Sequence, residues 1–249
     1  MMENIKYLPS GDSALVMEFG NEISKEINAS ISQVVNYLKD EKLNGIVDIL
    51  PTYRSILINY DPRVFTFDEL VEKLDSIEIA DTNLSDGNVR LIEIPTLYGG
   101  EYGPDISNVA ENAGLSEDEV IKIHAGVDYL VYMMGFLPGF TYLGGLDERI
   151  ATPRLSSPRL KIVPGSVGIA GTQTGMYPLE SPGGWQLIGR TPVKLYDPSN
   201  PESPVFINAG DYIRYVSVDE QTYNKILEEV NAGTYKVNIK EVKRGELRG

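Results

Sequence analysis

The chain has 249 residues, of which 42% are hydrophobic and 23% charged, enough for two modest domains with sizeable buried cores. Its formal net charge is −14 and it has no stripe of Lys and Arg, which argues against nucleic-acid binding because phosphate neutralisation needs clustered basic side chains. It has no cysteine and one histidine, which excludes disulfides, thiolate metal sites and cysteine nucleophiles and leaves no metal site evident.

The first part of the chain predicts alternating strands and helices. Residues 13–19 form a short strand candidate, and residues 45–52 and 54–61 form two more. Between them, Ser24 is a candidate N-cap for a helix whose apolar positions recur every three or four residues. That apolar face consists of Ile27, Ile31, Val34, Val35 and Leu38.

Two capping boxes predict further helix starts. Thr66 with Glu69 opens one helix, and Ser116 with Glu119 opens another that has His124 in its last turn. Gly126 is the expected stop for this second helix. Between the two boxes we expect a strand over residues 89–98 and a short helix from residue 105 to near residue 114.

From Gly135 onward the helical period disappears. Short apolar segments alternate with glycine and proline down to Tyr215, which is typical of a β-barrel or sandwich with tight turns. A last amphipathic helix is expected over residues 219–230, and the tail after it could add an edge strand. We therefore predict an α+β protein with a domain at 1–88, a second at 89–232 and a tail at 233–249, with a hinge at 85–88.

Common catalytic motifs are absent from the sequence. It contains no G-x-x-x-x-G-K-[ST], G-x-G-x-x-G, H-E-x-x-H or G-x-S-x-G, so a standard nucleotide fold, a zincin and a nucleophile elbow are unsupported. The sequence contains no run of 18 or more apolar residues, so we predict no membrane span. The first residues do not resemble a signal peptide. We expect a cytoplasmic protein.

The glycines gather in three neighbouring stretches. These are GFLPGFTYLGG (135–145), VPGSVGIAGTQTG (163–175) and ESPGGWQLIGRTP (180–192), and 11 of the 24 glycines lie between residues 135 and 189. Closely spaced glycines allow backbone N–H groups to face a ligand, but they also serve in tight hairpins. Both explanations remain open at this stage.

Candidate site residues come from these stretches and from the single histidine. Arg190 suits carboxylate or phosphate recognition, and His124 suits proton transfer near neutral pH. Each also has a structural alternative: His124 could cap helix carbonyls, Arg190 could pair with an acidic neighbour, and Glu180 could stabilise a turn. The aromatic residues could be core or wall. The candidates as catalytic residues are His124, Arg190 and Glu180, and those as substrate-binding residues are Gln173, Thr172, Gln186, Trp185 and Phe136.

The same stretches carry a family resemblance. YMMGFLPGFTYLGGLDERIATPR, VPGSVGIAGTQTGMYPLESPGGWQLIGRTP and FINAGDYIRY closely resemble the family that includes the B subunit of bacterial ATP-dependent 5-oxoprolinase. This family also includes the sporulation kinase inhibitor KipI and the allophanate hydrolase subunit 1 type domain of urea carboxylases. GDSALVMEFG, PTYRSILINYDP and IPTLYGGEYGPD extend the resemblance over nearly the whole chain.

The resemblance implies a small N-terminal α/β sandwich and a C-terminal cyclophilin-like β-barrel, without prolyl isomerase activity. It implies a C subunit of the allophanate hydrolase subunit 2 type and an A subunit of the LamB/YcsF type as partners. Together these would hydrolyse 5-oxo-L-proline to L-glutamate with ATP, which would bind at a site shared with the partner subunits, and this chain would be inactive alone. Within this family His124 matches a histidine, and Gln173, Glu180, Gln186 and Arg190 fall in the signature.

Two other functions fit the same resemblance. A KipI-like regulator would dock a sensor histidine kinase through aromatic anchors such as Phe136, Phe140 and Trp185. A domain of urea or allophanate metabolism is the weakest alternative, because the chain has no biotin carboxylase region. We expect the enzyme subunit.

Overall fold

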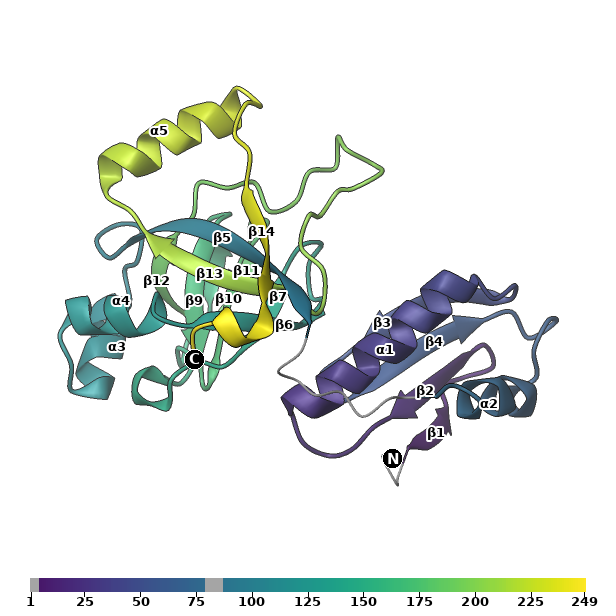
Figure 1. Ribbon diagram of the computed structural model, residues 1–249. Coiled ribbons are helices and arrows are strands. Elements are labelled where there is room, and N and C mark those ends of the chain that lie inside the picture. The colour runs from purple at the N-terminus through teal and green to yellow at the C-terminus, as the bar shows by residue number, and fades with distance from the viewer. Residues whose placement is uncertain (1–4, 79–86) are drawn as a thin grey trace. The chain divides into compact units, whose positions relative to one another are not determined.

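The computed structural model describes residues 5–78 and 87–249. It divides into two compact units, Met1–Gly87 and Asn88–Gly249, which we describe separately (Figure 1). The expected hinge begins at Ser85 and Asp86, which lie outside the described residues.

The N-terminal unit is one antiparallel sheet with two helices. The strands are β1 (Lys6–Pro9), β2 (Ala14–Glu18), β3 (Ile46–Pro51) and β4 (Ser55–Tyr60), in the order β1-β2-β4-β3. Helix α1 (Lys25–Glu41) crosses one face of this sheet (Figure 1), and α2 (Phe67–Asp75) contributes to the same core. The predicted apolar face of α1 is buried, as are Ile56 and Ile58 on alternate positions of β4.

The predicted helix caps in both units are confirmed. The Ser24 side chain accepts a hydrogen bond from the Ile27 N–H, and both capping boxes are complete in α2 and in α4 (Glu117–His124). α3 (Ile106–Ala113) ends at Gly114, which has a left-handed backbone conformation that glycine adopts without strain. α4 ends at His124 with Ala125 as its C-cap, so the expected stop Gly126 is the first residue after the cap.

The second unit is built around a closed β-barrel of β5, β6, β7, β9, β10, β12 and β13. Its strands are β5 (Asn88–Tyr98), β6 (Asp128–Met134), β7 (Thr141–Gly144), β9 (Ser166–Ala170), β10 (Gln173–Met176), β12 (Gln186–Arg190) and β13 (Tyr212–Ser217). They follow the order β12-β9-β10-β7-β6-β13-β5, and Leu97 and Tyr98 of β5 pair with Arg190 and Gly189 of β12 to close the ring. The mixed helix and strand architecture and the barrel are as predicted.

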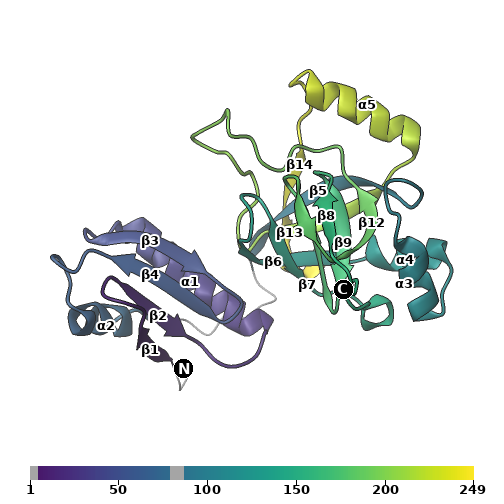
Figure 2. The same ribbon diagram turned by 180° about the vertical axis from the view of Figure 1, so that it is seen from behind.

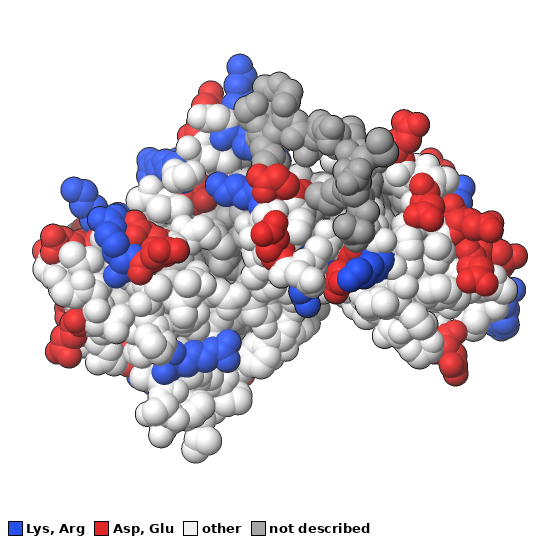
Figure 3. All heavy atoms as spheres, turned by 90° about the horizontal axis from the view of Figure 1, so that it is seen from below, with Lys and Arg blue, Asp and Glu red and all other residues white. Residues whose placement is uncertain are grey.

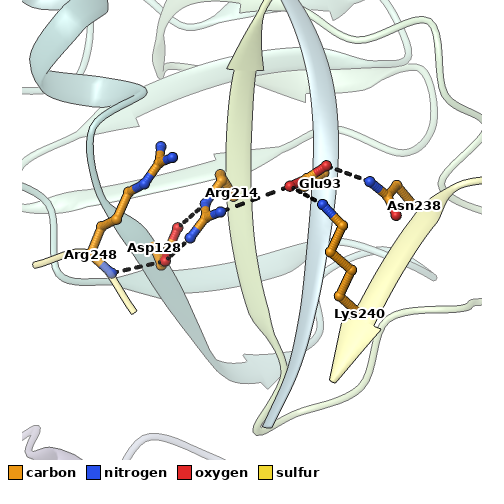
Figure 4. A network of polar contacts seen from close by, with 6 residues as sticks. All are labelled: Glu93, Asp128, Arg214, Asn238, Lys240 and Arg248. Carbon is orange, nitrogen blue, oxygen red and sulfur yellow. Dashed lines mark hydrogen bonds and ion pairs between the residues drawn. The ribbon is translucent and has the colours of Figure 1, made fainter. Parts of the chain in front are cut away.

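The long strand β5 pairs with β14 as well as with β12, along the same edge. Its first residues pair antiparallel with β14 (Asn238–Lys243), before its last residues reach β12. A chain of polar contacts crosses β14, β5, β13 and β6 on this side (Figure 4). Arg214 donates to both carboxylate oxygens of Asp128, at 2.7 and 2.6 Å, and Glu93 pairs with Lys240 at 2.9 Å. The tail after residue 232 therefore belongs to the packed structure.

Smaller elements surround the barrel. These are the two-stranded sheet of β8 (Arg159–Ile162) and β11 (Ser181–Gly183), the short helices η1 (Glu148–Ile150) and η2 (Arg244–Glu246), and α5 (Glu220–Asn231). Figure 2 shows the β8 side and α5 from behind. None of the helices in the described residues is long and apolar enough to cross a membrane.

Charged side chains on the surface are mixed in sign. On the face drawn in Figure 3, basic side chains occur singly or in small groups between acidic and uncharged ones over the described residues.

Candidate functional site

The three glycine-rich stretches converge on one aromatic cluster. Trp185 is buried, and its ring meets Phe140 edge-on at 5.5 Å and Tyr177 at 6.1 Å between centroids. Phe140 also contacts Tyr142 and Phe136, at 5.1 and 5.5 Å. Edge-to-face contacts of this kind favour a rigid arrangement. Stretches far apart in the sequence thus meet at one side of the barrel.

Several glycines of these stretches are needed for this packing. A Cβ at Gly175 would lie 2.7 Å from the Thr141 carbonyl oxygen and 3.1 Å from the Trp185 ring, and a Cβ at Gly183 would lie 2.5 Å from the Tyr177 hydroxyl. At Gly168 the Trp185 Cβ would be 3.2 Å away. These three glycines therefore allow close packing of protein on protein, which is neither of the two explanations considered from the sequence.

Phe136 lies at the edge of the cluster beside an open groove. Its side chain is 60% exposed and its φ of 67° is in the left-handed region, which costs free energy for a residue other than glycine. The groove has a volume of about 610 Å³ and lies between residues 134–139 and residues 202–208. In the second wall, Asn208 belongs to the FINAGDYIRY segment that carries the family resemblance, whereas no motif in the sequence pointed to Glu202.

Arg190 ends β12 at the seam of the barrel. Its guanidinium carbon lies 5.2 Å from the centroid of the Tyr102 ring, and its Nη2 donates to the Glu101 carbonyl oxygen at 3.4 Å. Its Nε is buried and has no hydrogen-bond partner among the described residues. The Tyr102 ring in turn meets Tyr223 of α5 edge-on at 4.9 Å. Arg190 is therefore held by the Tyr102 ring and the Glu101 carbonyl oxygen, groups that leave its charge uncompensated.

His124 lies inside the barrel unit and is not exposed at all. Its Nδ1 is 2.8 Å from the Tyr98 hydroxyl, and its Nε2 is 2.8 Å from Thr174 Oγ1. The rings of Tyr129 and Tyr215 pack on it at 5.4 and 4.6 Å. Burial lowers the pKa of His124 from its ordinary 6.5 to about 3, so the imidazole is neutral at physiological pH.

The two glutamines lie in different surroundings. Gln186 is buried, where its Nε2 donates to the Pro153 carbonyl oxygen at 2.9 Å and its Oε1 accepts from Asn108 at 3.2 Å. Gln173 begins β10 and is partly exposed, and Thr172 before it is exposed in the turn between β9 and β10. In this structure Gln186 joins α3 and β12 to the loop before β8.

Glu180 lies on the surface and contacts neither Arg190 nor His124. Its carboxylate pairs with Lys161 at 2.6 Å, and its side chain is 55% exposed. The structure thus links Trp185 and Phe136 through Phe140, but it gives no contact that joins His124, Arg190 and Glu180. Among the residues it describes, no group of three or more His, Cys, Asp or Glu could hold a metal ion.

A buried acid in this region had no role assigned from the sequence beyond starting a helix. Asp105 precedes α3, yet its carboxylate makes no cap hydrogen bond. It accepts instead from the Leu187 N–H at 2.7 Å and from Arg159 at 2.6 Å, and thereby ties β12 to β8. A local sequence pattern does not reveal such long-range partners.

Comparison with known proteins identifies the family. Residues 5–207 match the family described as carboxyltransferase domain, subdomain C and D. The chain is also 42% identical over 234 residues to the B subunit of 5-oxoprolinase from Bacillus subtilis (strain 168), covering 89% of this chain and 96% of that protein. The chain therefore belongs to the family of the carboxyltransferase domain, subdomain C and D.

Two other family relatives differ in how much of their length is matched. A conserved uncharacterized protein from Pyrococcus horikoshii has a crystal structure with a TM-score of 0.52 and 47% sequence identity, covering 88% of this chain and 100% of that chain. Urea amidolyase of Saccharomyces cerevisiae is 28% identical over 270 residues, covering 95% of this chain and 14% of that protein.

The family match includes candidate residues from the groove, the barrel seam and the barrel interior. Phe136, His124 and Arg190 lie inside residues 5–207, whereas α5 and β14 lie beyond them. Tyr223, which completes the aromatic support of Arg190, is therefore outside the matched part of the carboxyltransferase domain.

Proposed function

We propose that this chain is the B subunit of an ATP-dependent 5-oxoprolinase, which hydrolyses 5-oxo-L-proline to L-glutamate together with A and C subunits. The observation that carries the proposal is the 42% identity to the Bacillus subtilis B subunit over 96% of that protein. The match to urea amidolyase covers 14% of that protein, so it supports a role in urea metabolism less well.

The chemistry of 5-oxoprolinase requires a positively charged contact that binds an anion, and a group that transfers protons. A lactam is stable, and its opening calls for activation of the carbonyl oxygen by phosphoryl transfer and then attack by water. An anionic group must be held, and a planar guanidinium does this through two parallel hydrogen bonds. Arg190 suits this role because its charge is uncompensated by the contacts described above. The N–H groups of Gly165 and Gly171 donate to protein carbonyl oxygens, so backbone amides near Gly165–Gly175 could steady developing negative charge only if such bonds open.

Proton transfer by His124 stays a prediction. Its ring is enclosed, both ring nitrogens have partners, and its low pKa opposes the cationic state at neutral pH. Catalysis by His124 would require the Tyr98–His124–Thr174 chain to open. Glu180 is accessible, and a catalytic role for it would require exchange of Lys161 for another partner.

We propose that ATP binds at a site shared with partner subunits, because the sequence has no P-loop. The proposed partners are a C subunit of the allophanate hydrolase subunit 2 type and an A subunit of the LamB/YcsF type. We further propose that the barrel is of the cyclophilin-like class and that the protein acts in the cytoplasm. We propose domains at 1–88 and 89–232, with the tail at 233–249 packed on the second domain through β14.

The test is release of ADP that depends on 5-oxo-L-proline. We expect turnover by the co-purified A, B and C subunits and none by this chain alone. Arg190→Ala should abolish it, whereas Arg149→Ala should retain it because Arg149 is exposed and pairs with the neighbouring Asp147. Full activity of Arg190→Ala would remove Arg190 from the mechanism, and an inactive complete set would oppose the proposed function.

A second candidate function is a KipI-like inhibitor of a sensor histidine kinase. The exposed, left-handed Phe136 beside its groove favours a docking surface. This candidate predicts that micromolar protein lowers kinase autophosphorylation and that Phe136→Asn relieves the inhibition. No effect of the wild-type protein would count against it.

A further inference from the structure

Helix α5 contacts the barrel through one dominant side chain. Tyr223 is the buried residue of this helix, with 5% of its surface exposed, while the rest of α5 is exposed or partly exposed. Figures 1 and 2 both show α5 beside the end of β5 that leads to Tyr102. The tyrosine thus fixes the helix at the seam where β5 and β12 close the barrel.

Tyr223 reaches Arg190 through one intervening ring. Its ring meets Tyr102 at 4.9 Å with an interplanar angle of 61°, and Arg190 Cζ lies 5.2 Å from the centroid of that same Tyr102 ring. Edge-to-face contact fixes the Tyr102 plane, and a fixed plane orients the guanidinium against it. Burial raises the pKa of Tyr223 and Arg190 opposes that rise, which agrees with the closeness of the two groups.

The remaining contacts of Arg190 are weak. The bond from Nη2 to the Glu101 carbonyl is long, at 3.4 Å, and no ion pair to Arg190 occurs within residues 5–78 and 87–249. A guanidinium paired with a carboxylate would be both oriented and neutralised. Aromatic support orients it and leaves its charge available to an anionic ligand.

We propose that Tyr223 is a positioning residue that acts through Tyr102 to hold the Arg190 guanidinium for a carboxylate or phosphoryl group. This rests on the proposed function in one respect, namely that Arg190 holds an anion during turnover. It assigns a role in the site to α5, which lies beyond the family match.

The position of Arg190 can be tested without turnover. In the ¹H–¹⁵N spectrum of the intact chain, the buried Nε–H of Arg190 gives a resonance that is assigned by its loss in Arg190→Ala. Tyr223→Leu keeps an apolar side chain but removes the ring, so we expect this resonance to move toward that of free arginine and to broaden. Leu227→Ala on the same helix is the matched control and should leave it in place. An unchanged resonance in Tyr223→Leu would overturn the proposal.

The functional part is tested by kinetics of the assembled A, B and C subunits. We expect Tyr223→Leu to raise one KM about tenfold, with Tyr223→Phe within about twofold of the wild type since its ring remains. A raised KM for 5-oxo-L-proline would identify the carboxylate as the anion, and a raised KM for ATP would identify a phosphoryl group.

The outcomes separate the two proposals. If Arg190→Ala is inactive while Tyr223→Leu has normal KM values for both substrates, the role of Tyr223 is wrong and the proposed function stands. If the wild-type set shows no turnover, the proposed function and the anion role fail together, and the spectrum alone decides whether Tyr223 positions Arg190. An equal rise in KM for Leu227→Ala would also overturn the proposal, since it would reflect general displacement of α5.

Discussion

His124 Nε2 and Thr174 Oγ1 lie 2.8 Å apart in the interior of the barrel unit, and neither residue is exposed. The Thr174 hydroxyl donates to the Gly168 carbonyl oxygen at 3.0 Å, so it accepts the proton of His124 Nε2. His124 Nδ1 is then an acceptor for the Tyr98 hydroxyl. Nδ1 accepts in this way because burial lowers the pKa of His124 and keeps the imidazole neutral.

This arrangement predicts a pH dependence of stability. His124 has a pKa of about 3 when folded and an ordinary value of 6.5, so the unfolded chain binds more protons between these values. The free energy of unfolding should therefore fall as pH falls from 6.5, by about 2 kcal/mol between pH 7 and pH 5. Urea unfolding followed by fluorescence of Trp185, the single tryptophan, reports on the barrel unit.

The matched variant for this measurement is His124→Gln, which does not titrate. Its free energy of unfolding should change less between pH 7 and pH 5, whatever its absolute value. The same slope in both proteins would show that another group is responsible.

The Thr174 hydroxyl should itself stabilise the barrel. Thr174→Val removes a donor to Gly168 and leaves the buried Nε2–H of His124 without its acceptor, at a cost of about 1–3 kcal/mol. Thr174→Ser retains the hydroxyl and should lose less. Equal losses in the two variants, measured by the same fluorescence method, would show that the methyl group matters more than the hydrogen bonds.

Gly175 should tolerate no side chain. An added Cβ would lie 2.7 Å from the Thr141 carbonyl oxygen, which is backbone and cannot turn away. We expect Gly175→Ala to lower the free energy of unfolding by about 1–3 kcal/mol. Gly245→Ala is the control, because nothing lies within 4 Å of its added Cβ. A neutral Gly175→Ala would mean that Thr141 and Trp185 can shift.

Asp128 should be important for stability, whereas the Arg248 side chain should not. Asp128 is buried and receives two hydrogen bonds from Arg214 and one from the Arg248 backbone N–H. Asp128→Ala leaves the Arg214 charge without this partner, at a cost of about 3–5 kcal/mol. Arg248→Ala keeps the backbone donor and should be near neutral in thermal unfolding. A large loss in Arg248→Ala would contradict the backbone assignment.

Phe136 should matter more for partners than for folding. Asparagine tolerates the left-handed backbone better than phenylalanine, so relief of strain in Phe136→Asn should offset the lost contact with Phe140 to within about 1 kcal/mol. We expect weaker co-purification with the proposed A and C subunits, or weaker kinase inhibition. Unchanged assembly and inhibition would leave the exposed ring without a role in binding.

Local patterns in the sequence determined the helix ends and most strands. The N-cap at Ser24 and the capping boxes at Thr66 and Ser116 were predictable because each depends on residues within one turn. Strand β6 received no assignment, because its continuous apolar run does not separate a strand from a buried helix. The glycine-punctuated pattern from Gly135 indicated a β-rich unit, and the choice between barrel and sandwich awaited the pairing of β5 with β12.

Tertiary structure decided what the candidate residues do. The residue type of His124 suggests proton transfer, but burial among Tyr98, Tyr129 and Tyr215 makes it neutral. The sequence marked Arg190 as an anion-binding candidate, and only the fold brought the Tyr102 ring against its guanidinium and the Tyr223 ring against Tyr102. Helix caps and hydrophobic periodicity depend on residues that are neighbours in the sequence. Desolvation and ring contacts depend on residues tens of positions apart, which come close together only when the barrel has closed.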